Sequence, residues 1–485
     1  MKKLTLTFLF GLASLLAIIA ITSSRPAVSS GDEPESKPAV GLGEAEEPAA
    51  EEEAGEEELP KWWLARTKAA GRCMTCHKEK SPALYGQWRN SEHGRNGVTC
   101  LDCHTADESE SDAFNHEGTI IATLVTPKDC GRCHERESKE VQASYHATAG
   151  LILESKDAYL AHAAGGHPAA VAGCESCHGA KIEIDENSPN KLATTSWPNT
   201  GIGRLNPDGS KGSCTACHAR HSFSLAQARR PEACGKCHLG PDHPQKEIYD
   251  ESKHGGAFYG AVDEMNLKAK HWVVGVDYSA APTCATCHMS ATLKQKVTHD
   301  VGQRISWTLR PPVSKFKDEW QKKRQNMGDV CVACHGQRWV DGHYRQLDGV
   351  VHLYNEKFAK PAGEVMKLIK EKKLLERPAA FSNHIEWEYW ELWHHEGRRA
   401  RHGAAMMGPD YTWWHGIYDV AHNFYFKFMH SAKALGDPDV DALIKKIMES
   451  PEHSWFNRPT ADIKKDIKAG KLQDVYKSYF QAERK

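Results

Sequence analysis

The 485-residue sequence predicts a mainly α-helical protein in two parts, and three features of the chain support this. Sixteen cysteines lie between residues 73 and 334, in short segments at irregular intervals that favour short helices and loops over long sheets. After residue 345 there is no cysteine, and apolar residues recur at helical spacing. Segments with the alternating pattern of strands are few.

Residues 1–30 begin with two lysines, followed by an apolar run and then small residues. This is the pattern of a bacterial export signal, although the run from Leu4 to Thr22 is nearly long enough to span a bilayer. We therefore expect a signal peptide or a retained N-terminal anchor. Either one places the rest of the chain in the periplasm or an equivalent compartment outside the cytoplasm.

Residues 31–60 are rich in alanine, proline and glutamate and contain no aromatic residue. Such a segment cannot bury enough apolar surface to offset the entropy lost on ordering, so we expect a disordered acidic linker. The whole chain has 62 basic and 64 acidic residues, a balance that gives no electrostatic reason to expect nucleic acid as a partner.

All sixteen cysteines fall in eight Cys-x-x-Cys-His motifs. An exported chain with many cysteines would ordinarily form disulfides, but motifs that use every cysteine indicate covalent haem attachment instead. The two thiols form thioethers to the haem and the histidine coordinates its iron, so the sequence predicts eight c-type haems. The motif residues are Cys73, Cys76 and His77; Cys100, Cys103 and His104; Cys130, Cys133 and His134; Cys174, Cys177 and His178; Cys214, Cys217 and His218; Cys234, Cys237 and His238; Cys284, Cys287 and His288; and Cys331, Cys334 and His335.

Residues 61–345 are therefore predicted to form an octahaem domain in which the porphyrins supply most of the core. A C-terminal helical region follows over residues 346–485. Apolar spacing predicts helices over 364–377 and 384–405, and Trp387, Trp390 and His394 share one face of the second. Gly408-Pro409 breaks the chain, and Tyr411 to Lys433 is predicted to form another helix.

The sequence contains 28 histidines, so 20 remain after the eight motif histidines are set aside. That number is enough to give every iron a second axial ligand. Placement along the chain must therefore decide whether all eight irons are saturated or one is open.

Four stretches resemble the octahaem hydroxylamine oxidoreductase family: CHARHSFS (217–224), RRPEACGKCHLGPDHPQKEIYDESKHG (229–255), APTCATCHMSATLKQKVTHD (281–300) and PDYTWWHG (409–416). The similarity spans residues 73–425 and is most specific around the fifth to seventh motifs. It implies seven distal ligands, so one iron is open, and the family places that iron on the fourth motif (Cys174, Cys177 and His178). The implied distal ligands are His93, His116, His146, His221, His254, His299 and His402.

Two of these ligands have competitors along the chain. His162 or His167 is an alternative to His146, and His394 or His395 is an alternative to His402.

Asp242 and His243, in the segment GPDHP, match the family's active-site aspartate and histidine. A carboxylate beside a histidine suits a proton acceptor above the open iron. Alternatively, His243 is a further haem ligand or a turn residue. The sequence departs from the family over residues 300–314, where well-known members carry an active-site tyrosine and this chain has none; Trp307 or Arg310 lies nearest.

Tyr411 matches the tyrosine that oxidising members attach covalently to the catalytic haem of a neighbouring subunit. The resemblance therefore implies a homotrimer, and six of the 14 tryptophans lie in residues 384–455, which suits an interface. Two alternatives are that Tyr411 only packs with Trp413 and Trp414, or that Tyr418 forms the crosslink.

The expected function is oxidation of hydroxylamine, to nitric oxide or nitrite, at the fourth haem. Electrons would pass through seven bis-histidine haems to a small cytochrome c. The alternatives are oxidation of hydrazine to dinitrogen, reduction of nitrite or hydroxylamine to ammonia, and a conduit that carries electrons without catalysis. None of the motifs has the lysine that usually marks the catalytic haem of pentahaem nitrite reductases.

Overall fold

Helices form most of the part of the chain that the computed structural model describes, residues 61–154 and 156–480. The predicted mainly α fold is confirmed. The signal or anchor predicted over residues 1–30 and the linker predicted over 31–60 lie outside the described residues. Within the described part, no helix combines the length and the apolar character needed to cross a membrane.

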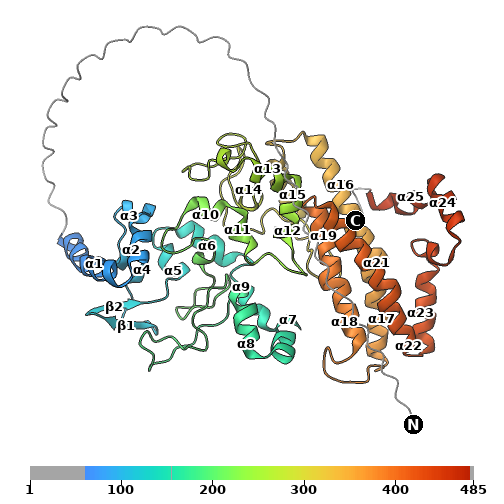
Figure 1. Cartoon of the computed structure of the whole chain (residues 1–485), viewed down its shortest axis with the longest axis horizontal. Coiled ribbons are helices and arrows are strands. Elements are labelled where there is room, and N and C mark those ends of the chain that lie inside the picture. The colour runs from blue at the N-terminus through green and yellow to red at the C-terminus, as the bar shows by residue number, and fades with distance from the viewer. Residues whose placement is uncertain (1–60, 155, 481–485) are drawn as a thin grey trace, which may run out of the picture. The chain divides into compact units, whose positions relative to one another are not determined.

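Short helices joined by loops make up the motif region (Figure 1). They are α1 (Lys61–Lys80), α2 (Pro82–Arg89), α3 (Glu92–Arg95), α4 (Cys100–His104), α5 (Pro127–Gly131), α6 (Glu135–Ala143), α7 (Lys156–Leu160), α8 (His167–Ala170), α9 (Ser176–His178), α10 (Leu225–Arg229), α11 (Pro231–Gly235), α12 (Gln245–Glu251), α13 (Lys253–Gly260), α14 (Cys284–His288) and α15 (Trp320–Cys331).

One hairpin interrupts these helices. Strand β1 (Ala113–His116) pairs antiparallel with β2 (Thr119–Ala122), with Ala113 opposite Ala122 and His116 opposite Thr119. The two residues of the turn, Glu117 and Gly118, both have positive φ angles, as tight hairpins with right-handed strand twist require. The hairpin therefore presents His116, one of the predicted ligands, beside its turn.

The C-terminal region consists of longer helical runs (Figure 1). In most of these runs α-helix alternates with π-helical turns. They are α16 (Gln337–Leu353), η6 (Tyr354–Ala359) and α17 (Lys360–Glu371); α18 (His384–Trp390), η7 (Glu391–Glu396) and α19 (Gly397–Ala405); α20 (Pro409–Thr412), η8 (Trp413–Tyr418), α21 (Asp419–Asn423), η9 (Phe424–Phe428) and α22 (Met429–Ala434); and α23 (Pro438–Met448), α24 (Thr460–Lys468) and α25 (Lys471–Tyr476).

The predicted helices of this region are present. The second run has the predicted limits of 384–405. The third begins at Pro409, inside the predicted break and two residues before the predicted start at Tyr411, and the helix predicted over 364–377 ends at Glu371. Trp390 and His394 stack with ring centroids 3.9 Å apart, as expected for residues on one face. The boundary predicted after residue 345 falls inside α16, so a continuous helix joins the two parts.

The largest hydrophobic core lies between these C-terminal helices. Buried side chains from η6, α17, η9 and α23 pack together, among them Phe358, Ile369, Phe424 and Ile444, each no more than 1% exposed. The motif region has smaller apolar clusters. This difference fits a motif region whose interior is completed by bound groups and a C-terminal region that folds around its own side chains.

A buried carboxyl group lies among the C-terminal helices. Glu396 accepts a hydrogen bond from Asn423 at 3.2 Å, while its second oxygen is buried without a hydrogen-bond partner. Burial raises the pKa of Glu396 to about 8, although the hydrogen bond from Asn423 opposes the shift. The folded protein therefore holds this side chain as a neutral acid near neutral pH.

We predict that Glu396→Gln makes stability less dependent on pH. The folded pKa of Glu396 is about 8 and its ordinary value is 4.5, so its protonation favours folding below pH 4.5, and this contribution is lost as pH rises to 8. At pH 8 the variant should be more stable than wild type by on the order of 2–4 kcal/mol, and at pH 4.5 the difference should vanish. Chemical denaturation followed by circular dichroism measures both values. Glu371→Gln, at an exposed position on α17, should show no such trend.

Candidate haem sites and active site

Each motif is closed by one helical turn, which brings its first cysteine and its histidine to the same side. The histidine amide donates to the carbonyl of the first cysteine in four motifs: His134 to Cys130 at 2.8 Å, His218 to Cys214 at 3.0 Å, His238 to Cys234 at 3.0 Å and His335 to Cys331 at 2.9 Å. In α4, α5 and α14 the turn is started by a threonine in a capping box, paired with Asp102, Asp129 and Thr286 respectively.

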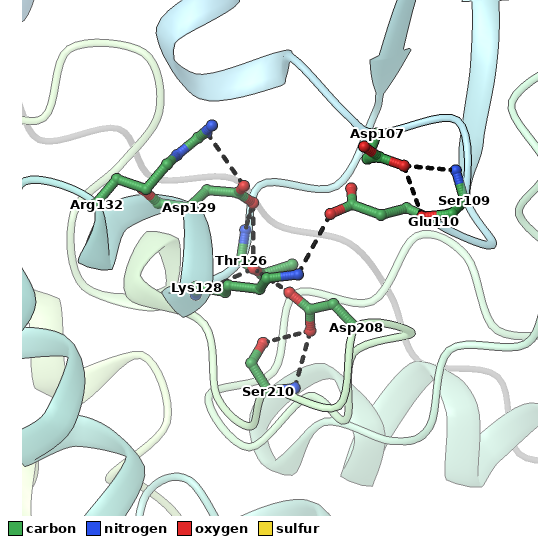
Figure 2. Close-up of polar contacts among 9 residues, drawn as sticks. All are labelled: Asp107, Ser109, Glu110, Thr126, Lys128, Asp129, Arg132, Asp208 and Ser210. Atoms are coloured by element: carbon green, nitrogen blue, oxygen red, sulfur yellow. Dashed lines mark hydrogen bonds and ion pairs between the residues drawn. The ribbon is translucent and has the colours of Figure 1, made fainter.

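Polar contacts tie the third motif to a distant loop (Figure 2). Thr126 donates from its hydroxyl to Asp208 at 2.7 Å, and Asp129 accepts from the amide of Thr126 at 2.9 Å. Lys128 pairs with Glu110 at 3.3 Å. These bonds fix the start of the third motif against residues 208–210, just ahead of the fifth motif.

The motif cysteines are all free of disulfides, and thiols of different motifs lie side by side. Cys130 and Cys214, Cys234 and Cys284, and Cys177 and Cys237 lie close enough for the thiols of each pair to shift one another's pKa. Attachment points of the third and fifth, sixth and seventh, and fourth and sixth motifs are therefore neighbours.

Six predicted distal histidines lie opposite a motif histidine. A metal–imidazole bond of about 2 Å puts two rings on opposite sides of one iron with centroids roughly 6 Å apart. The observed separations are 6.2 Å for His77–His116, 6.1 Å for His93–His134, 6.4 Å for His104–His221, 6.1 Å for His146–His238, 6.5 Å for His218–His299 and 6.1 Å for His254–His335. The residues present fit bis-histidine haem.

The electrostatics of these histidines suit iron ligation. Burial lowers the pKa of His218, His221 and His238 to about 4, with neighbouring positive charges acting in the same direction. The rings are therefore neutral, which is the form that binds a metal. In His104, Nδ1 hydrogen-bonds to the carbonyl of Ala122 at 2.9 Å, which leaves Nε2 for the metal.

The two predicted ligands that have competitors, His146 and His402, differ in their surroundings. His146 lies 6.1 Å from His238, whereas its competitors His162 and His167 stack on each other at 5.7 Å. His402, in α19, is 7% exposed; burial and the charges around it lower its pKa well below the ordinary value. Among the described residues no ring contact joins His402 to a motif histidine, so its role as a distal ligand stays a prediction.

Asp242 and His243 lie at a cavity of about 570 Å³ that His178 and His238 also line. Asp242 binds Nδ1 of His243 at 2.5 Å, and Nε2 of His243 contacts the carbonyl of Cys237 at 2.9 Å. Both acceptors are oxygens, so both bonds form together only when each ring nitrogen carries a hydrogen. In this arrangement protein groups engage both ring nitrogens of His243, although its ring lies 6.1 Å from that of His238, the same separation as in the His146–His238 pair.

A third residue, Arg398, completes this pair. Its Nη1 donates to Asp242 at 3.0 Å from α19. Burial acts to raise the pKa of Asp242, but the hydrogen bond from His243 and the charge of Arg398 hold it well below its usual range. The carboxylate therefore stays ionised and stabilises a protonated His243. Sequence reasoning missed Arg398; its only signal was an arginine cluster, RRAR, in a predicted helix.

Trp307 and Arg310, the two residues nearest the family's missing tyrosine, have different locations: one lies in the core and the other at the cavity. Trp307 is 4% exposed, stacks on Phe316 at 3.7 Å and donates to Asp348 at 2.8 Å. Arg310 lines the cavity beside Asp242 and His243. Of the two residues nearest the missing tyrosine, Arg310 is the one at the cavity.

Tyr411 lies outside the lining of this cavity. It stacks on His415 at 5.2 Å in the segment that follows α19, and the acids of α12 help burial to raise its pKa. Trp413, Trp414 and Tyr418 are 51%, 56% and 47% exposed, so an aromatic surface surrounds it.

Comparisons with known proteins agree with this geometry. Residues 206–377 match the family described as seven times multi-haem cytochrome CxxCH, and residues 82–164 match the cytochrome c552 family. The fold is that of a multihaem cytochrome c. Among solved structures, a hypothetical multiheme protein covers 78% of this chain and is covered to 98% of its own length, with 24% identity and a TM-score of 0.67.

A second solved structure, described as a reducing HAO-like protein complex of Kuenenia stuttgartiensis, covers 81% of the chain and is covered to 89%, with 20% identity and a TM-score of 0.58. Two curated relatives are each 24% identical. One is a probable nitrite reductase-hydroxylamine oxidoreductase fusion protein of Kuenenia stuttgartiensis (71% of this chain, 49% of the relative), the other a high-molecular-weight cytochrome c of Nitratidesulfovibrio vulgaris (50% and 51%). The chain thus spans about half the length of these curated relatives.

We predict that His116→Ala adds one high-spin haem to the electron paramagnetic resonance spectrum, because the ring opposite His77 is lost. His162→Ala is the control, since His162 stacks on His167 and not on a motif histidine. If the His116→Ala spectrum keeps only the wild-type signals, then His116 is not an axial ligand.

Proposed function

We propose that this chain is a multihaem redox enzyme that oxidises hydroxylamine at the haem of the fourth motif. The observation that carries the proposal is the shared cavity of His178, Asp242 and His243. A histidine that coordinates iron, beside a histidine–carboxylate pair, suits a reaction that moves electrons and protons together.

When bound, the haems supply the electron acceptors and the path by which electrons leave. Conversion of hydroxylamine and one water to nitrite releases four electrons and five protons; stopping at nitric oxide releases three of each. Electrons would pass from the fourth to the sixth motif, whose thiols Cys177 and Cys237 adjoin, and finally to a small cytochrome c outside the cytoplasm.

The protein groups handle the protons. His243 would exchange protons with the cavity through Nε2 when its bond to the Cys237 carbonyl opens. Asp242 stabilises the resulting imidazolium through Nδ1, and Arg398 keeps that carboxylate in position. The same sites suit hydrazine, which differs from hydroxylamine by an amino group in place of the hydroxyl.

Reduction of nitrite or hydroxylamine to ammonia is the second candidate, and a specific observation favours it. The two hydrogen bonds of His243 require a hydrogen on both nitrogens, so in this arrangement the ring is a proton donor, as a reductive reaction needs. The missing tyrosine over residues 300–314 and the similarity to a complex described as reducing support the same direction.

We predict that Asp242→Asn lowers the rate of hydroxylamine oxidation by about 10²-fold, because the protonated form of His243 loses its counter-charge. Steady-state assays with an artificial electron acceptor measure this rate, and the haem optical spectrum should stay unchanged. Asp250→Asn, a partly exposed residue paired with Lys246, is the control and should keep the wild-type rate. A new high-spin haem in His243→Ala would instead show that His243 is an axial ligand, contrary to the proposal.

We predict that a haem peptide containing Cys174 and Cys177 carries a third covalent link, to a peptide containing Tyr411 of a neighbouring subunit in a homotrimer. A phenol bonded to the porphyrin edge breaks its conjugation and disfavours electron accumulation, which biases the site towards oxidation. Mass spectrometry after proteolysis detects the link, and Tyr411→Phe should abolish it. A haem held in wild type by two thioethers alone would refute the crosslink and support the reductive direction.

A further inference from the structure

Two arginines of α19 fix the segment that replaces the family's tyrosine-bearing stretch. Arg398 donates through Nε to the carbonyl of Arg310 at 2.9 Å and through Nη1 to Asp242 at 3.0 Å. Arg401 donates to the carbonyl of Pro311 at 2.9 Å and to Ser314 at 2.5 Å. These arginines are 9% and 0% exposed, so the segment is held from the interior next to Asp242.

The side chain of Arg310, unlike its backbone, has no bonding partner among the described residues. Its guanidinium makes no hydrogen bond and no ion pair with any residue in the described ranges 61–154 and 156–480, although its backbone carbonyl is bound by Arg398. It lines the same cavity as His178, Asp242 and His243. A fixed backbone thus presents an unpaired cation to the cavity.

We propose that Arg310 is the residue that recognises a planar oxyanion, nitrite, in this cavity. A guanidinium presents parallel N–H donors that match two coplanar oxygens, which a lysine or a neutral side chain does not. The inference rests on the proposed function, where nitrite is the product of one direction and the substrate of the other. Hydroxylamine carries no charge near neutral pH, so Arg310 discriminates between the two compounds.

Other charges around the cavity agree with an anionic ligand. Lys370 and Arg398 add positive charge to the lining, against the carboxylates of Asp242 and Glu386. Asp242 is already compensated by Arg398 and His243, so the field that a ligand meets near Arg310 is positive. A haem propionate offers the same carboxylate-like chemistry, and the experiment must separate it from free nitrite.

The test uses the haem-loaded full chain and compares Arg310→Gln, Arg310→Lys and wild type, with Arg345→Gln on the exposed side of α16 as the charge control. Sodium nitrite is titrated into the oxidised protein and its dissociation constant is read from the haem absorption. Carbon monoxide, a neutral ligand, is titrated into the reduced protein in parallel. A charge-assisted bidentate contact predicts about 10- to 100-fold weaker nitrite binding in Arg310→Gln, with carbon monoxide binding unchanged.

The nitrite dissociation constant of Arg310→Lys should lie between those of Arg310→Gln and wild type, because lysine keeps the positive charge but cannot donate two parallel hydrogen bonds. The nitrite dissociation constant of Arg345→Gln should equal that of wild type. Equal nitrite affinity in Arg310→Gln and wild type overturns the inference while leaving the proposed function intact. Weakened binding of both ligands, together with a shifted haem potential, shows that Arg310 holds a propionate and also overturns it. If wild type binds neither nitrite nor carbon monoxide, the protein has no iron with an open coordination site, and the proposed function is wrong.

Discussion

The distance that one iron imposes between two imidazole rings, roughly 6 Å between centroids, is the constraint on which the motif region depends. The motif histidine is fixed by a single helical turn next to its cysteines. Its partner comes from any element that reaches the opposite side: the α3 helix for His93, the hairpin for His116, and the loops between helices for His221 and His299. The region needs no extended sheet and has little regular packing of its own, because each pair positions only the segment that carries it.

The C-terminal helices follow a different rule, and besides the continuous helix α16 they contact the motif region through hydrogen bonds of two arginines. Their aliphatic and aromatic side chains close a core without help from any bound group. Helix α19, which continues directly from η7 of this core, places Arg398 and Arg401 so that they donate to three backbone or side-chain acceptors of residues 310–314 and to Asp242. A buried guanidinium group that lost these acceptors would destabilise the folded protein. The hydrogen bonds of Arg398 and Arg401 (the arginine clamp) therefore hold residues 310–314 rigidly beside the candidate active site.

The parts of this architecture that follow local rules were predictable, and those that depend on long-range charge were not. The limits of the helix over 384–405 follow from its apolar spacing, and six of the histidines that the motif resemblance names lie opposite motif histidines. Arg398 is separated from Asp242 by 156 residues, and neither helical spacing nor the GPDHP motif indicates that they meet. Whether Trp307 lies in the core or at the cavity also depends on tertiary packing, because the sequence around a tryptophan does not distinguish the two locations.

The contacts of Arg398 also separate proton transfer from anion binding in the candidate active site. Arg398 donates hydrogen bonds to the Asp242 carboxylate and to the backbone carbonyl of residue 310, so its positive charge is largely compensated by Asp242. The positive charge available to a ligand is therefore displaced to Arg310, whose guanidinium the clamp leaves unpaired among the described residues. Proton handling at Asp242 and His243 and anion binding at Arg310 thus become separate functions of adjacent groups, held in register by one buried side chain. A substitution at Arg398 would disturb both functions at once, whereas one at Arg310 would disturb only the second.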